Sequence, residues 1–312
     1  MKTLALILLS LLLGACARSD SGNPETGTPP SIESKGPDDV VLRVDTGGGF
    51  VPVEVNLADI PEFSLYGDGR VITQGPQIMI YPGPALPNLL VREIAQAGVT
   101  EILKAAQKAG LTGSNRNFDQ AANVVTDMPT TTFTLSTDDG THETSAYGFD
   151  FLREVENLSD KDREAIDALF EFQSFIQDLE GRLPEGSVGK EESYEPRQMR
   201  VHATERVTQP AEEPTGEQPA ETPAETPEEP AIEPPVEELP QEPVAWPLPA
   251  PLSEFGQPSQ PESYRCGTVE GADLDLLLTA AQKANQLSPW TSGDKTYTVI
   301  LRPLLPDETG CP

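Results

Sequence analysis

Two stretches of the chain, VTEILKAAQKAGL (99–111) and LDLLLTAAQKANQL (274–287), read almost alike. Both place apolar residues at i, i+3, i+4, i+7 and i+10, which is the spacing of one face of a helix. Both faces also end in alanines, where a neighbouring sheet or helix can approach closely. The sequence therefore predicts two helices that bury equivalent faces.

The segments around the two helices also correspond. YPGPALP (81–87) precedes the first helix as WPLPAPL (246–252) precedes the second, and TTTFTLS (130–136) follows the first as DKTYTVI (294–300) follows the second. This order predicts two repeated strand–helix–strand units that pack together. The alternative is that the two helices merely reuse common helix-forming residues.

Alternating apolar residues and Gly- or Pro-containing turns predict a sheet around these helices. We expect hairpins at 63–74 and 130–147, strands on both sides of Gly47–Gly49, strands over 77–83 and 297–303, and a helix from the N-cap Ser159 to Gly181. The expected fold class is α+β, a mainly antiparallel sheet with a few packed helices.

An acidic, proline-rich tract at 208–243 holds ten prolines, eleven glutamates and no basic residue. Such a segment cannot build a core and predicts an extended, disordered linker. The following segment, 244–312, is too short to form a stable core alone. We therefore expect 38–207 to be the main part of one domain and 244–312 to be the C-terminal part of that domain.

The N-terminus has a basic head, a short apolar run and the sequence LGAC ending at Cys16. This layout predicts a lipoprotein signal peptide over 1–15, lipidation of Cys16 and a flexible tether over 16–37. The expected location is the outer face of the cell membrane, or the outer membrane of a cell with two membranes. A plain secretory signal with a chance cysteine is the alternative.

Charge and cysteine content restrict the partners further. A formal net charge of −30 excludes sequence-independent binding to nucleic acid and disfavours anionic lipid heads. In an exported chain, Cys266 and Cys311 predict a disulfide that closes a loop of about 45 residues and contributes about 4 kcal/mol.

Several motifs together resemble a group of exported bacterial lipoproteins of actinobacterial and chloroflexus type: GGGFVP (47–52), PEFSLYGDGRVI (61–72), IYPGPALP (80–87), AYGF (146–149), RCGTVEGADL (265–274) and RPLLPDETGC (302–311). The resemblance covers roughly 38–200 and 244–312 and skips the acidic tract. It implies export and one continuous fold, and it implies no chemistry.

Candidate chemical groups are few. The two histidines, His142 and His202, are expected at the surface, and no hydrolase, metal-ligand or phosphate-binding motif accompanies them. We therefore predict no catalytic residue, no cofactor and no metal site, although aspartates at turns, such as Asp138, leave a bound cation as a minor alternative. Asp307 and Glu308 are equally suited to a structural pair with Arg302 and to a chemical role.

Aromatic residues beside prolines are the most distinctive local feature. Tyr81, Trp246 and Trp290 are candidate ligand-facing residues, with packing between the two repeats as the alternative. The predicted function is that of a monomeric, lipid-anchored envelope protein, a binding or structural module for an envelope protein or a glycan. The alternatives are an envelope hydrolase that uses carboxylates, or a modulator of a secreted protein.

Overall fold

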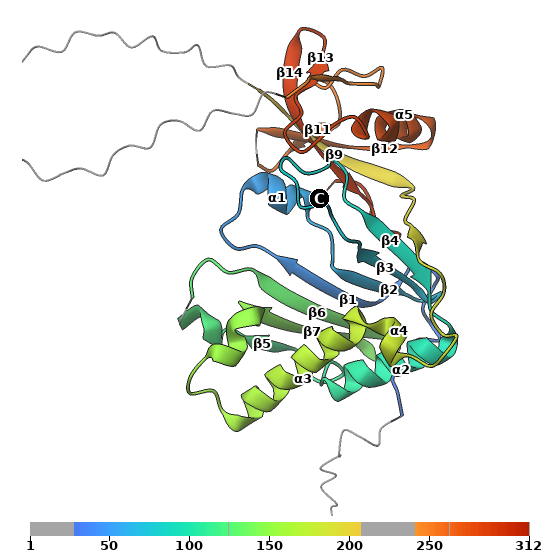
Figure 1. Ribbon diagram of the computed structural model, residues 1–312, viewed down its shortest axis with the longest axis vertical. Helices are drawn as coiled ribbons and strands as arrows, with labels where there is room; N and C mark the ends of the chain where they lie inside the picture. Colours follow the sequence, from blue (N-terminus) through green and yellow to red (C-terminus); the bar gives the residue numbers. More distant parts are fainter. Residues whose placement is uncertain (1–27, 124, 207–240, 262, 312) are drawn as a thin grey trace, which may run out of the picture.

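The computed structural model describes residues 28–123, 125–206, 241–261 and 263–311. These residues form two largely antiparallel sheets with helices on their outer faces (Figure 1). The α+β class is confirmed, with two sheets in place of the single sheet expected.

The first sheet has eight strands in the order β5-β7-β6-β1-β2-β3-β4-β8. Its strands are β1 (Val40–Gly47), β2 (Phe63–Tyr66), β3 (Arg70–Gln74), β4 (Leu89–Glu93), β5 (Arg116–Phe118), β6 (Thr130–Thr137), β7 (Gly140–Tyr147) and β8 (Glu192–Ser193). The helical elements attached to it are α2 (Gln96–Lys108), η1 (Gln120–Asn123), η2 (Phe149–Glu154), α3 (Asp160–Gln177) and α4 (Leu179–Arg182). Figure 1 shows α2 and α3 below this sheet.

The second sheet has six strands in the order β10-β13-β14-β9-β12-β11. Its strands are β9 (Gln198–Glu205), β10 (Val244–Ala245), β11 (Gln257–Ser259), β12 (Tyr264–Glu270), β13 (Trp290–Ser292) and β14 (Lys295–Pro303). Helix α5 (Gly271–Ala281) covers its outer face. Strand β9 comes before the acidic tract, yet it pairs with β12 and β14, which come after it.

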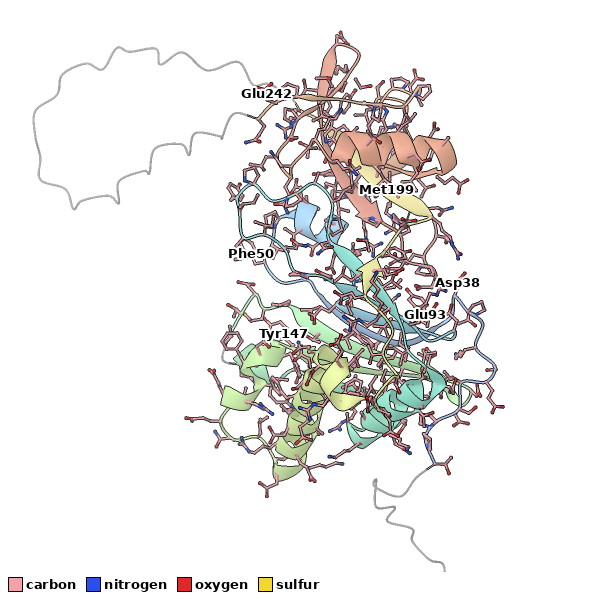
Figure 2. The ribbon with its side chains drawn as sticks, turned by 45° about the vertical axis from the view of Figure 1, so that its right-hand side comes forward. Asp38, Phe50, Glu93, Tyr147, Met199 and Glu242 are labelled. Carbon is pink, nitrogen blue, oxygen red and sulfur yellow. A yellow bond between two sulfur atoms is a disulfide. The ribbon has the colours of Figure 1, made fainter. Side chains whose placement is uncertain are left out.

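Each sheet has its own apolar core. The first core lies between the first sheet and helices α2 and α3, and all its buried members fall within 41–183. The second core joins Met199, Val201 and Ala203 of β9 to residues that follow the tract. Figure 2 shows the labelled Met199 on the strand beneath α5. The second core is therefore assembled from both sides of the tract.

Two short segments fill the space between the sheets. One is helix α1 (Val53–Ala58), which connects β1 to β2, and the other is the C-terminal tail 304–311. The chain end marked C in Figure 1 lies between the two sheets. Leu305 of the tail packs against Tyr66 and Ile72 of the first sheet. The disulfide between Cys266 and Cys311, whose Cα atoms are 5.9 Å apart, holds the tail to β12.

The two similar helices do occupy equivalent places in the element order. α2 lies between β4 and β5, and α5 lies between β12 and β13. The expected faces are buried, with Val99 and Ile102 in the first helix and Leu274 and Leu277 in the second. The two helices nevertheless belong to different cores, so the repeats do not share one core as expected. The proline-containing segment before α2 does reach the second repeat, where the carbonyl of Gly83 accepts a hydrogen bond from Gln286 N–H.

Several local expectations are confirmed. The hairpins β2–β3 and β6–β7 are present. Ser159 caps α3 by accepting a hydrogen bond from the backbone N–H of Asp162. Other expectations are wrong: 53–58 is the short helix α1, and 77–83 has no strand and forms an exposed connection between β3 and β4. Uncharged apolar runs of this length do not distinguish a strand from a loop.

The tether expected over 16–37 is not wholly detached from the body. The side chains of Ser31 and Ser34 both donate hydrogen bonds to the carboxylate of Asp138, which lies in the β6–β7 turn. These bonds lower the pKa of Asp138 to about 2. The predicted signal peptide (1–15), the first part of the tether (16–27) and residues 208–240 of the predicted linker lie outside the described residues.

Candidate functional site

A cavity of about 280 Å³ lies between the two sheets, beside α1 and the C-terminal tail. Its lining is mostly polar and comes from five parts of the chain: Arg43, Asp45, Asn56, Leu57, Asp59, Pro61, Arg200, His202, Arg302 and Glu308. Such a convergence of titratable groups in a concave site is typical of binding and catalytic sites.

Strand β1 supplies the wall on the first sheet. Leu42 and Val44 enter the first core, so the alternation of a strand turns Arg43 and Asp45 towards the cavity. The Arg43 guanidinium donates two hydrogen bonds to Asp307 of the tail, at 2.8 and 3.0 Å. Burial alone would lower the pKa of Arg43, but its bonds to Asp307 outweigh burial and raise it.

Strands β9 and β14 supply the opposite wall. Met199 and Val201 face the second core, so Arg200 and His202 face the cavity. Arg200 stands directly opposite Arg302 in the β9–β14 pairing, which places both side chains on one face. These two strands therefore bring two guanidinium groups together.

All three guanidinium nitrogens of Arg302 donate hydrogen bonds. Arg302 forms a two-pronged ion pair with Glu308, with N–O distances of 2.6 and 2.7 Å, and its Nε donates to the backbone carbonyl of Asp59 at 2.5 Å. Burial by itself would raise the pKa of Glu308, but the hydrogen bonds and charge of Arg302 hold it below its ordinary value. Of the two alternatives, the structural pair with Arg302 is present for Glu308, whereas Asp307 pairs with Arg43.

His202 is only 1% exposed, so its expected place at the surface is wrong. Its Nε2 lies 3.9 Å from the disulfide sulfur of Cys266, and its buried Nδ1 has no hydrogen-bonding partner among the described residues. Burial, together with the charges of Arg200 and Arg302, lowers the pKa of His202 to about 4. The imidazole is therefore neutral at physiological pH and can offer a donor or an acceptor to the cavity.

Two carboxyl groups on the first-sheet side have raised pKa values, whereas that of His202 is lowered. Burial raises the pKa of Asp45 despite the nearby Arg43 and Arg302. Burial and the neighbouring Asp45 raise the pKa of Asp59, at the C-terminal end of α1, to about 6. Asp59 therefore changes its protonation state within the physiological range.

The charges around the cavity do not all cancel in pairs. Arg43 with Asp307 and Arg302 with Glu308 form two ion pairs. Arg200 forms no salt bridge within the described part of the chain, and its Nε donates to the backbone carbonyl of Gly310. Burial, and then the charge of Arg302, lower the pKa of Arg200. Among the described residues, the cavity therefore holds an arginine without a counter-ion.

Unsatisfied polar atoms point to the same place. Among the described residues, three buried side-chain oxygen or nitrogen atoms have no hydrogen-bonding partner, and two of them, Asp45 Oδ1 and His202 Nδ1, belong to residues that line this cavity. An unsatisfied buried polar group costs about 1–3 kcal/mol, so such groups commonly mark a site for water, an ion or a ligand.

A larger cavity of about 420 Å³ lies between the first sheet and the C-terminal end of α3. Its one lining arginine, Arg92, is already paired with Glu180 and Glu191. None of the unsatisfied buried atoms found in the described residues lines this space. We therefore place the candidate site between the sheets, where the chemistry is, although the cavity there is smaller.

The residues expected to face a ligand lie elsewhere. Trp246 and Trp290 are buried in the second core, where their rings pack edge to face 6.1 Å apart. They therefore face no ligand, and they pack within the second repeat and not between the two repeats. Tyr81 is 75% exposed in the β3–β4 connection. Cys266 and Cys311 form the disulfide on the cavity side of β12, while Cys16 lies outside the described residues.

Sequence reasoning missed Arg43, Asp45, Asp59 and Arg200. A signal was present in two of the strands, because Arg43 and Asp45 alternate with buried residues in VVLRVDTG, as Arg200 and His202 do in QMRVHATE. Such alternation normally marks a solvent-facing side. Only the second layer turns these faces into walls of a cavity.

The described residues contain no cluster of three or more histidine, cysteine, aspartate or glutamate residues that could hold a metal ion. The turn residue Asp68 instead pairs with Arg70. A membrane-spanning helix is likewise not found in the described part of the chain. Searches of protein-family models, curated proteins and solved structures gave no match to this chain.

Proposed function

We propose that the protein is a lipid-anchored binding module of the cell envelope, and that its ligand is a small polar molecule bound between the two sheets. The observation that carries the ligand site is the convergence of three groups: the buried atoms His202 Nδ1 and Asp45 Oδ1, and the guanidinium of Arg200. Within the part of the chain that the structure describes, the two atoms have no hydrogen-bonding partner and Arg200 has no counter-ion. The anchor is supported by the LGAC sequence that ends at Cys16.

The polar groups favour one class of ligand. Arg200 offers a guanidinium for a carboxylate or phosphate, while Asp45 accepts from a hydroxyl or amino group. A ligand with an anionic group and a nearby donor, such as an amino acid or a sugar acid, would satisfy both. A cavity of about 280 Å³ limits the ligand to a small molecule.

The test is a thermal-shift screen of amino acids, sugar acids and phosphorylated sugars. We expect at least one compound to raise the melting temperature of the wild-type protein and to leave Arg200→Leu and Asp45→Leu unshifted. Lys295→Leu is the control, because Lys295 forms an exposed pair with Glu205 on the same sheet and should respond like wild type. Equal stabilisation of all four proteins, or of none, contradicts the assignment.

The membrane location has a separate test. Replacing Cys16 by serine should move the exported protein from the membrane fraction to the soluble fraction, since acyl chains supply about 0.8 kcal/mol for each buried methylene. Unchanged fractionation would contradict the lipid anchor and leave the cavity assignment standing.

A second candidate function is hydrolysis by a carboxylate pair. It is favoured by one observation, that Asp59 has a pKa of about 6 beside Asp45, whose pKa is also raised. Such a pair can supply a general acid and a general base near neutral pH. Release of methylumbelliferone from a glycoside or ester panel by wild type, and not by Asp59→Asn, would support it.

A further inference from the structure

The charges around the cavity between the sheets do not balance. Ion pairs with the C-terminal tail, whose end lies between the sheets (Figure 1), neutralise Arg43 and Arg302. Arg200, Asp45 and Asp59 also line the cavity, and none of these three forms a salt bridge in the part of the chain that the structure describes. One positive and two negative charges therefore remain without a partner when both aspartates are ionised.

The two aspartates are close enough to act on each other. Burial, the charge of Asp45 and the charge of Glu62 together raise the pKa of Asp59 to about 6. Asp45 Oδ1 is buried and has no hydrogen-bonding partner among the described residues. A neutral hydroxyl group would satisfy this oxygen but would leave the repulsion between the carboxylates, whereas an ammonium group relieves both. This side of the cavity therefore suits ammonium groups.

The opposite wall suits a carboxylate. Arg200 Nε donates to the backbone carbonyl of Gly310 at 2.7 Å, and this bond leaves the charge of the guanidinium without compensation. His202 is buried, and its Nδ1 lacks a hydrogen-bonding partner within the described chain. A carboxylate in the cavity would accept a charge-assisted bond from the guanidinium and a further bond from Nδ1–H of the neutral imidazole. This buried nitrogen points to a ligand independently of the aspartates.

The charge of the whole chain favours the same class of ligand. A formal net charge of −30 raises the local concentration of small cations and lowers that of anions. A sugar acid or a phosphorylated sugar carries a net negative charge and would enter the cavity against this field. A molecule with one carboxylate and two ammonium groups carries a net positive charge, and it matches the three unpaired side chains group by group.

We propose that the cavity binds a diamino acid such as lysine or ornithine. The carboxylate of the ligand lies against Arg200 and His202, and its two ammonium groups lie against Asp45 and Asp59. This inference rests on the proposed binding function, and it narrows the ligand from small polar molecules to one class. A cavity of about 280 Å³ lies near the lower end of the range for ligand pockets, which suits a molecule of this size.

The test compares each diamino acid with two fragments of itself, by calorimetric titration of the purified protein near pH 8, where Asp59 is ionised. For lysine the fragments are norleucine, which lacks the side-chain ammonium group, and cadaverine, which lacks the carboxylate. For ornithine they are norvaline and putrescine. At least one of the two diamino acids should bind about tenfold or more tightly than both of its fragments, because each fragment leaves a charged group of the cavity without its partner.

Variants assign the contacts to named side chains. Asp45→Asn and Asp59→Asn should each weaken binding of the diamino acid about tenfold. Arg200→Leu should weaken binding of the diamino acid by a similar factor and should not weaken binding of the diamine. Asp294→Asn is the matched control: it removes the same charge from an exposed position in the β13–β14 turn, so it should bind like wild type.

Three results would overturn the assignment. The first is equal affinity for a diamino acid and for its fragment without the side-chain ammonium group. The second is unchanged binding of the diamino acid to Asp59→Asn. The third is tighter binding of the diamine than of the diamino acid, which would indicate a general attraction of cations. If a sugar acid, a phosphorylated sugar or a monoamino acid binds while both diamino acids do not, this inference fails and the proposed binding function stands. If no compound binds, both fail.

Discussion

The two cores of the molecule are built in different ways. The first draws on one continuous stretch, 41–183, and no cysteine takes part in it. The second needs three residues of β9 from before the acidic tract and the rest from after it, and a disulfide holds the tail beneath its sheet. Bringing distant segments together to form a core has a larger entropic cost than forming a core from one continuous stretch, and a covalent link offsets part of that cost.

The contact between the two sheets differs again from both cores. Its apolar part is small and contains five buried residues, Ile60, Tyr66, Ile72, Leu89 and Leu305. Around it stand two ion pairs, each with one partner on the C-terminal tail. Removing one member of such a largely buried pair leaves the other without compensation, so we expect these pairs to help determine how the sheets fit together. We expect them also to make the two cores unfold as one cooperative unit.

The largest effect should come from the first core, where Phe133 is fully buried and packs on Phe149 at 5.5 Å between ring centres. Phe133→Ala should lower the free energy of unfolding by about 3–5 kcal/mol, because it leaves a cavity. Urea unfolding should be followed by far-UV circular dichroism and by tryptophan fluorescence. Both tryptophans lie in the second core, so fluorescence reports on the sheet that the substitution does not touch.

If the sheets unfold together, both probes should shift by the same amount. A fluorescence midpoint that stays in place while circular dichroism moves would show two independent units and would contradict the role given to the ion pairs. Phe50→Ala is the control. It makes the same chemical change at an exposed position and should alter stability by less than about 0.5 kcal/mol.

A smaller effect is expected at the disulfide. Cys311→Ser opens a loop of 45 residues and should cost about 2–4 kcal/mol, as measured by urea unfolding. The Cys311 side is exposed, so the loss should come from the cross-link and not from packing. Wild-type protein treated with a reductant should show the same loss. Full stability in either case would mean that β9 and the tail hold the second sheet without the covalent link.

Much of the first sheet could be predicted from the sequence, because its signals are local. The β6–β7 hairpin follows from alternation around Asp138–Gly140, and Ser159 begins α3 where an N-cap residue meets an apolar helical pattern. The connection at 77–83 resisted prediction, since exposed Ile78 and Met79 have the composition of a buried strand. Composition cannot reveal that such residues face outward.

The candidate site could not be predicted in the same way. Arg43 and Arg200 are far apart in the chain, and each occupies an ordinary polar position of an amphipathic strand. Only the C-terminal tail, whose Asp307 and Gly310 bond them, brings their two strands to opposite walls of one space. His202 was misplaced for the same reason, because its strand follows the pattern of an exposed face until the tail and α1 cover it.

The smallest effect is the pH dependence that Asp59 gives to the free energy of unfolding. It bears directly on the space between the sheets. The pKa of Asp59 is about 6 in the folded protein and 3.8 as a free side chain, with Asp45 and Glu62 raising it alongside burial and Arg302 opposing them. A raised folded pKa means that the folded state holds the proton more tightly. The protonated group therefore favours folding at low pH, and this contribution is lost as pH rises through about 6.

Asp59→Asn removes the buried charge. The variant should be more stable than wild type by about 1 kcal/mol at pH 8, after allowance for the partial exposure of Asp59, and equal to wild type below about pH 4. Urea unfolding of both proteins across this range, with the exposed Asp294→Asn as control, measures the difference. A difference that does not change with pH would mean that Asp59 is solvated, and that the space between the sheets is not the low-dielectric site described above.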